Sequence, residues 1–182
     1  MQQPVNRTHR SARGFTMIEC AVSLAMVALT VGAGIPSIQQ ASERRQLEGA
    51  AAQLATDIRQ ARSAAVALTA PVRLSFHQSS SGSCYLLHTG RASDCQCGPN
   101  GQAVCTNGAQ VIRPVAFPAS SRLLIASNST SMLFDPHRGT VTPTASINLQ
   151  LRQGPTIRQV VNIMGRVRSC TPSADLPGYA AC

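Results

Sequence analysis

The hydrophobic pattern of the chain begins with one long apolar run. Residues 15–35 are apolar or small throughout, apart from the single acid Glu19. This run of 21 residues is long enough to cross the hydrocarbon core of a bilayer as a helix. The residues before it, 1–14, are polar and include three arginines. We therefore predict a membrane-spanning helix over residues 15–36, preceded by a basic leader.

A second apolar pattern follows the run. Gly32, Gly34 and Pro36 are predicted to interrupt the helix, because a proline inside a helix kinks it or opens it locally. Apolar residues then recur every three or four positions, which is the spacing of one helix face. This stripe consists of Leu47, Ala51, Leu54, Ile58, Ala61, Ala65 and Leu68. Residues 37–68 should continue the helix outside the membrane. The stripe is mostly alanine, which favours packing on the chain's own sheet over a coiled-coil partner.

The period of the pattern changes after Pro71, where the helix is predicted to end. Val72, Leu74 and Phe76 alternate with polar residues, as in a strand with one buried face. Further strands are predicted at 84–88, 111–117, 122–126, 131–134, 147–151 and 157–164, with a disulfide-stapled loop at 90–107. Because no helices alternate with these strands, the sheet should be mainly antiparallel. The predicted fold class is α+β, with one long helix packed on a β domain of residues 69–182.

Seven cysteines divide into Cys20, within the apolar run, and six further along the chain. The six are Cys84, Cys95, Cys97, Cys105, Cys170 and Cys182. An even set is typical of disulfides in an oxidising compartment. Zinc is the alternative for the first four, but a single Cys-x-Cys between lone cysteines lacks the paired spacing of zinc sites. We predict disulfides, pair Cys170 with Cys182 on proximity alone, and leave the other pairing open.

Positive charge is carried by arginine alone, with 16 Arg against seven Asp and Glu. The region 71–182 holds nine Arg and three acids, a net charge of +6, and residues 152–168 hold four Arg and no acid. A guanidinium is a planar fork of donors that suits phosphate and carboxylate. The excess therefore indicates either an anionic partner or no more than the amino-acid usage of a GC-rich genome.

No motif indicates an enzyme. None of the four histidines lies at HExxH or another metal-ligand spacing, and no glycine-rich phosphate loop is present. The segment 135–139, Asp-Pro-His-Arg-Gly, has the proline and glycine of a turn between strands. We predict no catalytic site, no metal and no cofactor.

The position of Glu19 bears on the fate of the helix. A carboxylate inside a spanning segment costs on the order of 2.5–3.5 kcal/mol on insertion scales, so such residues are usually functional and paired. The alternative is that Glu19 snorkels to the headgroups from near the helix start. A secretory signal peptide also begins with basic residues, but its apolar part is shorter and lacks an acid. The basic leader predicts a single-pass protein whose C-terminal domain crosses the membrane.

The segment Gly14-Phe15-Thr16-Met17-Ile18-Glu19 resembles the processing signal of type IV prepilins and type II secretion pseudopilins. The resemblance implies cleavage between Gly14 and Phe15 by the prepilin peptidase, and N-methylation of Phe15. It also implies that Glu19 pairs with the N-terminal amine of a neighbouring pilin during assembly. The implied location is the bacterial inner membrane with the C-terminus in the periplasm, and then a pilus at the cell surface.

The remaining candidate site is Gly165-Arg166-Val167-Arg168. On an extended strand, Arg166 and Arg168 would point the same way. Arg152 and Arg158 are near in sequence and would extend a basic face that binds a phosphate backbone without reading bases. The alternative is a solvated edge strand whose arginines discourage edge-to-edge pairing.

The strings Asp135-Pro136-x-Arg138-Gly139 and Gly165-Arg166-x-Arg168 resemble the GspH/FimT branch of the pilins, and FimT in particular. In that family a Gly-Arg-x-Arg motif belongs to a DNA-binding surface used in natural transformation. The resemblance implicates Arg166 and Arg168, while Arg152 and Arg158 are added on charge alone. Single-strand stacking is disfavoured because the chain has no Trp, four Phe and two Tyr. The implied partner is double-stranded DNA.

Two alternatives share the same N-terminal signal and fold. One is a structural minor pilin that contacts only other pilins during pilus biogenesis. The other is a minor pseudopilin of type II secretion. The sequence does not separate them from a DNA-binding pilin.

Overall fold

A computed structural model of the chain describes residues 14–98, 101–173 and 176–182, with only the backbone of residues 31 and 33–37. The predicted leader, residues 1–14, lies outside these ranges except for Gly14. The described chain divides into two compact units, residues 1–41 and 42–182. Each unit is considered separately below.

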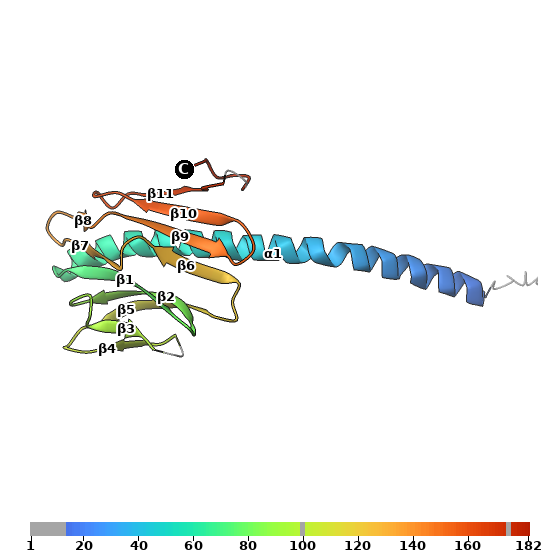
Figure 1. The fold of residues 1–182 in the computed structure, drawn as a ribbon, viewed down its shortest axis with the longest axis horizontal. Helices are drawn as coiled ribbons and strands as arrows, with labels where there is room; N and C mark the ends of the chain where they lie inside the picture. Colours follow the sequence, from blue (N-terminus) through green and yellow to red (C-terminus); the bar gives the residue numbers. More distant parts are fainter. Residues whose placement is uncertain (1–13, 99–100, 174–175) are drawn as a thin grey trace, which may run out of the picture. The chain divides into compact units, whose positions relative to one another are not determined.

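Within the described ranges, one helix precedes eleven strands (Figure 1). Their bounds are α1 Met17–Leu68, β1 Val72–Ser79, β2 Gly82–Thr89, β3 Cys95–Cys97, β4 Ala103–Cys105, β5 Val111–Pro118, β6 Leu123–Ser127, β7 Ser131–Phe134, β8 Val141–Thr142, β9 Ala145–Leu151, β10 Thr156–Val161 and β11 Val167–Cys170.

The first unit contains the start of helix α1. Thr16 precedes the first turn, and its Oγ1 accepts a hydrogen bond from the Glu19 N–H at 3.3 Å. Thr16-x-x-Glu19 is the sequence form of a capping box, and this bond is one half of it. Glu19 therefore also lies at a capping position, in the first turn, where an acid complements the positive end of the helix dipole.

One prediction for this helix is corrected and another is not confirmed. The helix runs through Pro36 without interruption, although this proline removes one N–H from the hydrogen-bond ladder. No helix in the described ranges is long and apolar enough to cross a membrane. The predicted span over residues 15–36 is therefore not confirmed.

The second unit contains three antiparallel sheets. The larger two have the strand orders β5-β2-β1-β7-β8 and β11-β10-β9-β6, and β3 pairs with β4 (Figure 1). All ladder pairs between the named strands are antiparallel. The α+β, pilin-like class with a mainly antiparallel sheet is thereby confirmed.

One hydrophobic core joins residues 47–68 of α1 to both larger sheets. Leu47, Leu54 and Ile58 have no exposed surface and belong to the same cluster as Leu74 of β1 and Ile147 of β9. The predicted stripe is therefore the buried face of the helix as far as Ala65, whereas Leu68 at the helix end is 54 % exposed. At the small residue Ala51 a sheet side chain reaches the helix backbone, since the Gln159 amide of β10 donates to the Ala51 carbonyl at 3.0 Å.

The disulfides all lie in the second unit. Cys170 is joined to Cys182, Cys84 to Cys97, and Cys95 to Cys105. The last two bridges hold the β3–β4 hairpin, which occupies most of the segment predicted as a loop at 90–107. The sequence pattern missed these strands because each is only three residues long. Cys20 is unpaired and exposed.

Candidate nucleic-acid interface

The Gly-Arg-x-Arg motif lies in a β-hairpin formed by β10 and β11. The predicted strand 157–164 ends earlier than expected, because a tight turn begins at Asn162. The Asn162 N–H donates to the Arg166 carbonyl at 3.1 Å, and the Gly165 N–H donates to the Asn162 carbonyl at 2.9 Å. The side-chain oxygen of Asn162 accepts from the N–H groups of Met164 and Arg166 at 3.1 and 2.9 Å. Gly165 has a φ of +71°, a conformation that favours glycine.

Strand register places the hairpin arginines on one face. Arg168 lies opposite Val160, and Arg158 lies opposite Cys170. Gln159, between them, points to the other face, where its amide donates to the Ala51 carbonyl of α1 at 3.0 Å. Since strand residues alternate between faces, Arg158 and Arg168 face away from the helix, and Arg166 continues their side.

The accessibility of these arginines differs. Arg166 and Arg168 are exposed, and β11, which carries Arg168, is an edge strand of its sheet. Arg158 is half-buried, and its Nε donates to the Asn148 side chain at 2.9 Å. Arg166 and Arg168 therefore have the freer guanidinium groups, whereas Arg158 already has a fixed partner on the same face.

The structure does not bring Arg152 to this cluster. Arg152 follows β9, in the turn that precedes β10, whereas Arg166 lies in the turn after β10. Its Nη2 donates to the Ala119 carbonyl at 3.1 Å. The six residues of β10 separate the two turns, which corresponds to about 20 Å at about 3.4 Å per residue.

The turn at 135–139 lies beside the hairpin turn. Asp135 Oδ1 accepts from the N–H groups of His137 and Arg138 at 2.8 and 2.7 Å. The N–H bond from Arg138, followed by that from His137, lowers the pKa of Asp135 below its ordinary value. The Val141 N–H just after this turn donates to the Ile163 carbonyl at 2.8 Å. The chain just after residues 135–139 is thus hydrogen-bonded to the chain just before residues 165–168.

Arg62 of α1 lies against both turns. A Cβ at Gly139 would come within 2.9 Å of Arg62 Nε, and a Cβ at Gly165 within 3.5 Å of Arg62 Cδ. Both glycines have positive φ, +61° and +71°. Glycine at these two positions therefore leaves the room that the Arg62 side chain occupies. Arg59 and Arg62 also line a shallow groove of about 500 Å³ that ends at Gly165.

The arginines of this surface lack acidic partners. The three ion pairs among described residues join Arg44 to Glu48, Arg113 to Asp57 and Arg122 to Glu43. The five exposed arginines near the two turns belong to none of these pairs: Arg59, Arg62, Arg138, Arg166 and Arg168. We call these five residues the arginine surface. A concentration of unpaired guanidinium groups attracts a polyanion.

Arg59, Arg62 and Arg138 were missed as site residues by sequence reasoning. The sequence places Arg59 and Arg62 off the apolar stripe of the helix, and Arg138 in the turn at residues 135–139. The sequence does contain a signal that Arg59 and Arg62 are unpaired, because neither has an acid three or four residues away on the helix. Their proximity to the hairpin could not be read from sequence, because it depends on how α1 packs on the sheets.

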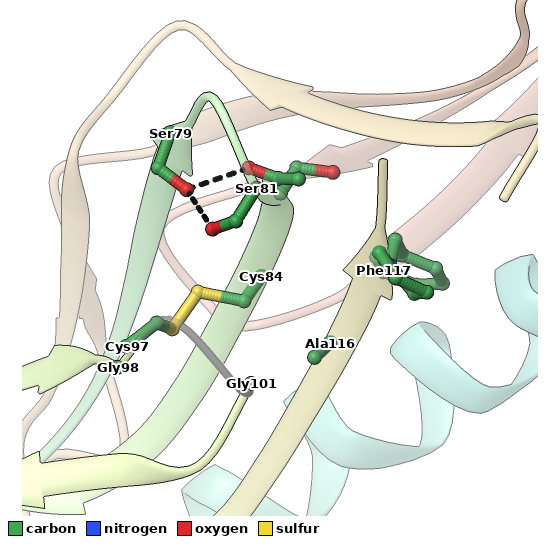
Figure 2. Close-up of a pocket in the computed structure, with 11 residues that line it drawn as sticks. Ser79, Ser81, Cys84, Cys97, Gly98, Gly101, Ala116 and Phe117 are labelled. Atoms are coloured by element: carbon green, nitrogen blue, oxygen red, sulfur yellow. Dashed lines mark hydrogen bonds between the residues drawn. A yellow bond between two sulfur atoms is a disulfide. The ribbon is translucent and has the colours of Figure 1, made fainter. Parts of the chain in front are cut away.

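A pocket under the β3–β4 hairpin has no comparable chemistry. It has a volume of about 210 Å³ and is lined by serines of the β1–β2 turn, the Cys84–Cys97 disulfide and Phe117 (Figure 2). Ser79 and Ser81 hydrogen-bond to each other at 2.7 Å beside it. Its described lining contains no ionisable side chain, so it offers no group that would move a proton at neutral pH.

A buried serine–histidine pair also lacks the arrangement of a catalytic site. His88 Nδ1 donates to the Thr89 carbonyl at 2.8 Å, so Nε2 accepts from the Ser75 hydroxyl, also at 2.8 Å. Burial is the main cause that lowers the pKa of His88 below 6.5. Both residues are essentially without exposed surface, so the serine cannot reach a substrate. No group of three His, Cys, Asp or Glu side chains in the described ranges is placed to hold a metal ion.

An N-terminal helix packed on an antiparallel β domain is the architecture of a pilin-like protein. Residues 50–165, more than half of the chain, match the model of the family described as type II transport protein GspH. The chain therefore belongs to the GspH family of pilins and pseudopilins. No curated protein and no solved structure gives a significant match. The finer resemblance, to FimT, stays a prediction.

Proposed function

We propose that this member of the GspH family is a minor type IV pilin of the FimT kind, which binds extracellular double-stranded DNA for uptake in natural transformation. As a family member it has a minor pilin or pseudopilin role, which implies a membrane-anchored component of a fibre of other pilins. The observation that carries the DNA proposal is the pair Arg166 and Arg168, exposed without acidic partners at a sheet edge. It is a binding role and not an enzymatic one.

The chemistry of this pair fits the phosphate backbone. Arginine contacts to phosphate release counterions, so affinity should fall steeply with salt and should not depend on base sequence. Arg158 supports the same face, although its bond to Asn148 reduces its reach. Arg152 lies at the far end of β10. It adds to the total positive charge and would contact the DNA at a greater distance from the hairpin turn.

A gel-shift titration with the full chain in nonionic detergent tests the proposal. The double variant Arg166→Gln/Arg168→Gln should bind every duplex more weakly, and its salt slope should fall by about 0.9 for each lost contact. The matched control is Arg45→Gln/Arg91→Gln, which removes the same charge from two exposed arginines outside the hairpin. Absence of binding at low salt would overturn the DNA proposal. An equal loss in the control would show that only the net charge matters.

We also propose the processing that the N-terminal signal implies. The prepilin peptidase cleaves between Gly14 and Phe15, Phe15 is N-methylated, and Glu19 pairs with the N-terminal amine of a neighbouring subunit. The exposed Phe15 and the start of α1 at Met17 are compatible with this, because cleavage would leave the helix on the mature protein. The intact mass of the protein purified from cells tests it. A mature chain that retains residues 1–14 would overturn it.

The proposed location follows from processing and from the disulfides. The chain is anchored in the bacterial inner membrane by its N-terminal segment, with residues 42–182 in the periplasm, and then enters a pilus. Three disulfides in that unit support the oxidising compartment, since cytosolic thiols are kept reduced. Thiol labelling of intact cells with a membrane-impermeant reagent, after reduction, tests the placement.

A second function is favoured by the family itself, which is described as a type II transport protein. In that case the chain is a minor pseudopilin of type II secretion, and deletion would abolish exoprotein secretion. A third possibility is a structural minor pilin. If deletion abolished piliation and the variant Arg166→Gln/Arg168→Gln restored both fibres and transformation, the structural role would replace the DNA-binding one.

A further inference from the structure

The tip of the β10–β11 hairpin exposes two apolar side chains. Ile163 is 56 % exposed and Met164 is 49 % exposed, directly beside Gly165 and Arg166. Burying such a pair of neighbouring apolar side chains against a partner would be favourable. The tip is therefore a candidate contact that the arginines alone do not explain.

The tip is held in one conformation by backbone hydrogen bonds. Asn162 binds the Met164 and Arg166 N–H groups through its side chain, and the Ile163 carbonyl accepts from Val141. Gly165 is buried against Val141 and Arg62. Little conformational entropy remains to be lost when such a tip binds, which favours its use as a preformed contact.

Cationic groups lie on both sides of the tip. Arg62 approaches Gly165 from the helix side, and strand alternation puts Arg166 and Arg168 on the opposite side. None of the three pairs with an acid that the structure describes. The arrangement is a narrow apolar ridge with guanidinium groups on both sides.

The charge balance argues against a second copy of this chain as the partner. The chain has seven acids in all. Six of these lie in the described ranges. Asp57 is buried, and Glu43 and Glu48 pair with arginines. Asp94 and Asp135 accept hydrogen bonds within their own loops, and Glu19 stands alone in the first turn of α1. A second copy therefore offers no described cluster of acids to neutralise the arginine surface.

A DNA duplex matches both features. Its two phosphate strands lie on either side of a groove, and the major groove, about 12 Å wide, admits a two-stranded β-ribbon. Apolar side chains in that groove contact the C5-methyl groups of thymine. We infer that the hairpin tip enters the major groove, where Ile163 and Met164 contact base edges while Arg62 and Arg166 bind the phosphates on opposite sides. This inference rests on the proposed DNA binding.

The test removes the thymine methyl groups without changing the charge. Fluorescence anisotropy, with the full chain in nonionic detergent at one low salt concentration, compares an alternating dA–dT duplex with a dA–dU duplex of the same length. The wild type should bind the dT duplex about fourfold more tightly for each methyl group contacted. This is the change in affinity expected from burying one methylene group. The variant Ile163→Ala/Met164→Ala should lose this preference and keep its salt slope. Val104→Ala, which truncates a residue that is 59 % exposed in β4, is the control and should keep both.

The outcomes separate the inference from the proposed function. Equal affinity of the wild type for both duplexes, or a preference retained by Ile163→Ala/Met164→Ala, would overturn groove entry and leave DNA binding intact. Absence of binding to either duplex would overturn the proposed function, and binding to anionic vesicles instead would assign the ridge to a membrane surface. Circular dichroism of each variant confirms folding, and the single change Met164→Ala replaces the double one if the latter does not fold.

Discussion

The Tyr85 hydroxyl donates a hydrogen bond of 2.7 Å to Asp57 Oδ2 in the core between helix α1 and strand β2. Asp57 has no exposed surface, and its other oxygen accepts from the Gln53 amide at 2.8 Å and pairs with Arg113 at 3.2 Å. Burial, followed by the bond to Asp57, raises the pKa of Tyr85, so the phenol stays protonated as a donor. The buried carboxylate of Asp57 on the helix thus has three partners, which are Tyr85, Gln53 and Arg113.

Removal of the Tyr85 hydroxyl should destabilise the domain. Tyr85→Phe keeps the ring contacts with Phe76 and Phe117 but removes a donor from a buried carboxylate. A hydrogen bond to a charged group contributes about 1.5–3 kcal/mol, and the free energy of unfolding in urea should fall by that amount. Tyr179→Phe is the control, since no hydrogen bond of its hydroxyl involves a described residue. A loss below about 0.5 kcal/mol would contradict the assigned role.

Stability should decrease as the pH falls below neutrality, because of His88. Its pKa in the folded state is lowered, chiefly by burial, from an ordinary value of 6.5. Below pH 6.5 the unfolded chain therefore binds a proton that the folded chain rejects, and stability falls by up to about 1.4 kcal/mol per pH unit for one such group. His77, whose pKa is lowered by burial and by the charge of His88, acts in the same direction.

Urea unfolding at a series of pH values from 7.5 to 5 measures this dependence. The slope of stability against pH, rather than stability itself, is compared between the wild type and His88→Gln. The variant should have the shallower slope. The exposed His137, changed to Gln, is the comparison variant that removes one histidine from the surface. Parallel curves for the wild type and His88→Gln would show that His88 does not titrate with unfolding.

The fold could be predicted from the sequence where the hydrophobic pattern extends over many residues. The stripe from Leu47 to Ala65 predicted the buried helix face because its spacing repeats over several turns. The short strands β3, β4 and β8 were missed, since two or three residues show no alternation. The end of β10 was misplaced because apolar residues lie on both sides of Asn162, whose side chain accepts two N–H bonds in the turn that ends the strand.

The candidate site was predicted only in part. Arg166 and Arg168 could be chosen from sequence, because their spacing alone puts them on one face of a strand. Arg152 looked equivalent by distance along the chain, yet β10 separates it from them. Arg62 is 104 positions from Arg166 in sequence, and only the packing of α1 against two glycine turns brings them together. Long-range packing of this kind has no signature in one sequence.

The Cys170–Cys182 disulfide should stabilise the end of the β domain. It closes a loop with a sequence separation of 12, for which the chain-entropy model gives about 3 kcal/mol. Cys170→Ala/Cys182→Ala should lower the free energy of unfolding by about 2–4 kcal/mol under oxidising conditions. Cys20→Ala, which removes the free thiol, should have no such effect. Because Cys170 lies opposite Arg158, a shift of the hairpin would also show as weaker DNA binding.

A single methyl group at Gly139 should test whether the position of Arg62 matters, with all charges kept. The Cβ of Gly139→Ala would lie 2.9 Å from Arg62 Nε and would push the guanidinium away from the hairpin turn. Gly108→Ala is the matched control, because its φ of +73° imposes the same kind of backbone strain while nothing lies within 4 Å of the added Cβ. Both variants should lose about 1–2 kcal/mol of stability from the positive φ.

Only Gly139→Ala should weaken DNA binding, towards the level of Arg62→Gln. The variant Arg62→Gln should also lower the salt slope by about 0.9, since one phosphate contact is lost. If Gly139→Ala bound as Gly108→Ala does, the place of Arg62 between the turns would be irrelevant to binding. If Arg62→Gln also bound as the wild type does, the DNA surface would be confined to the outer face of the hairpin. The position of one helical arginine thus decides whether DNA meets the edge strand alone or both sides of the hairpin.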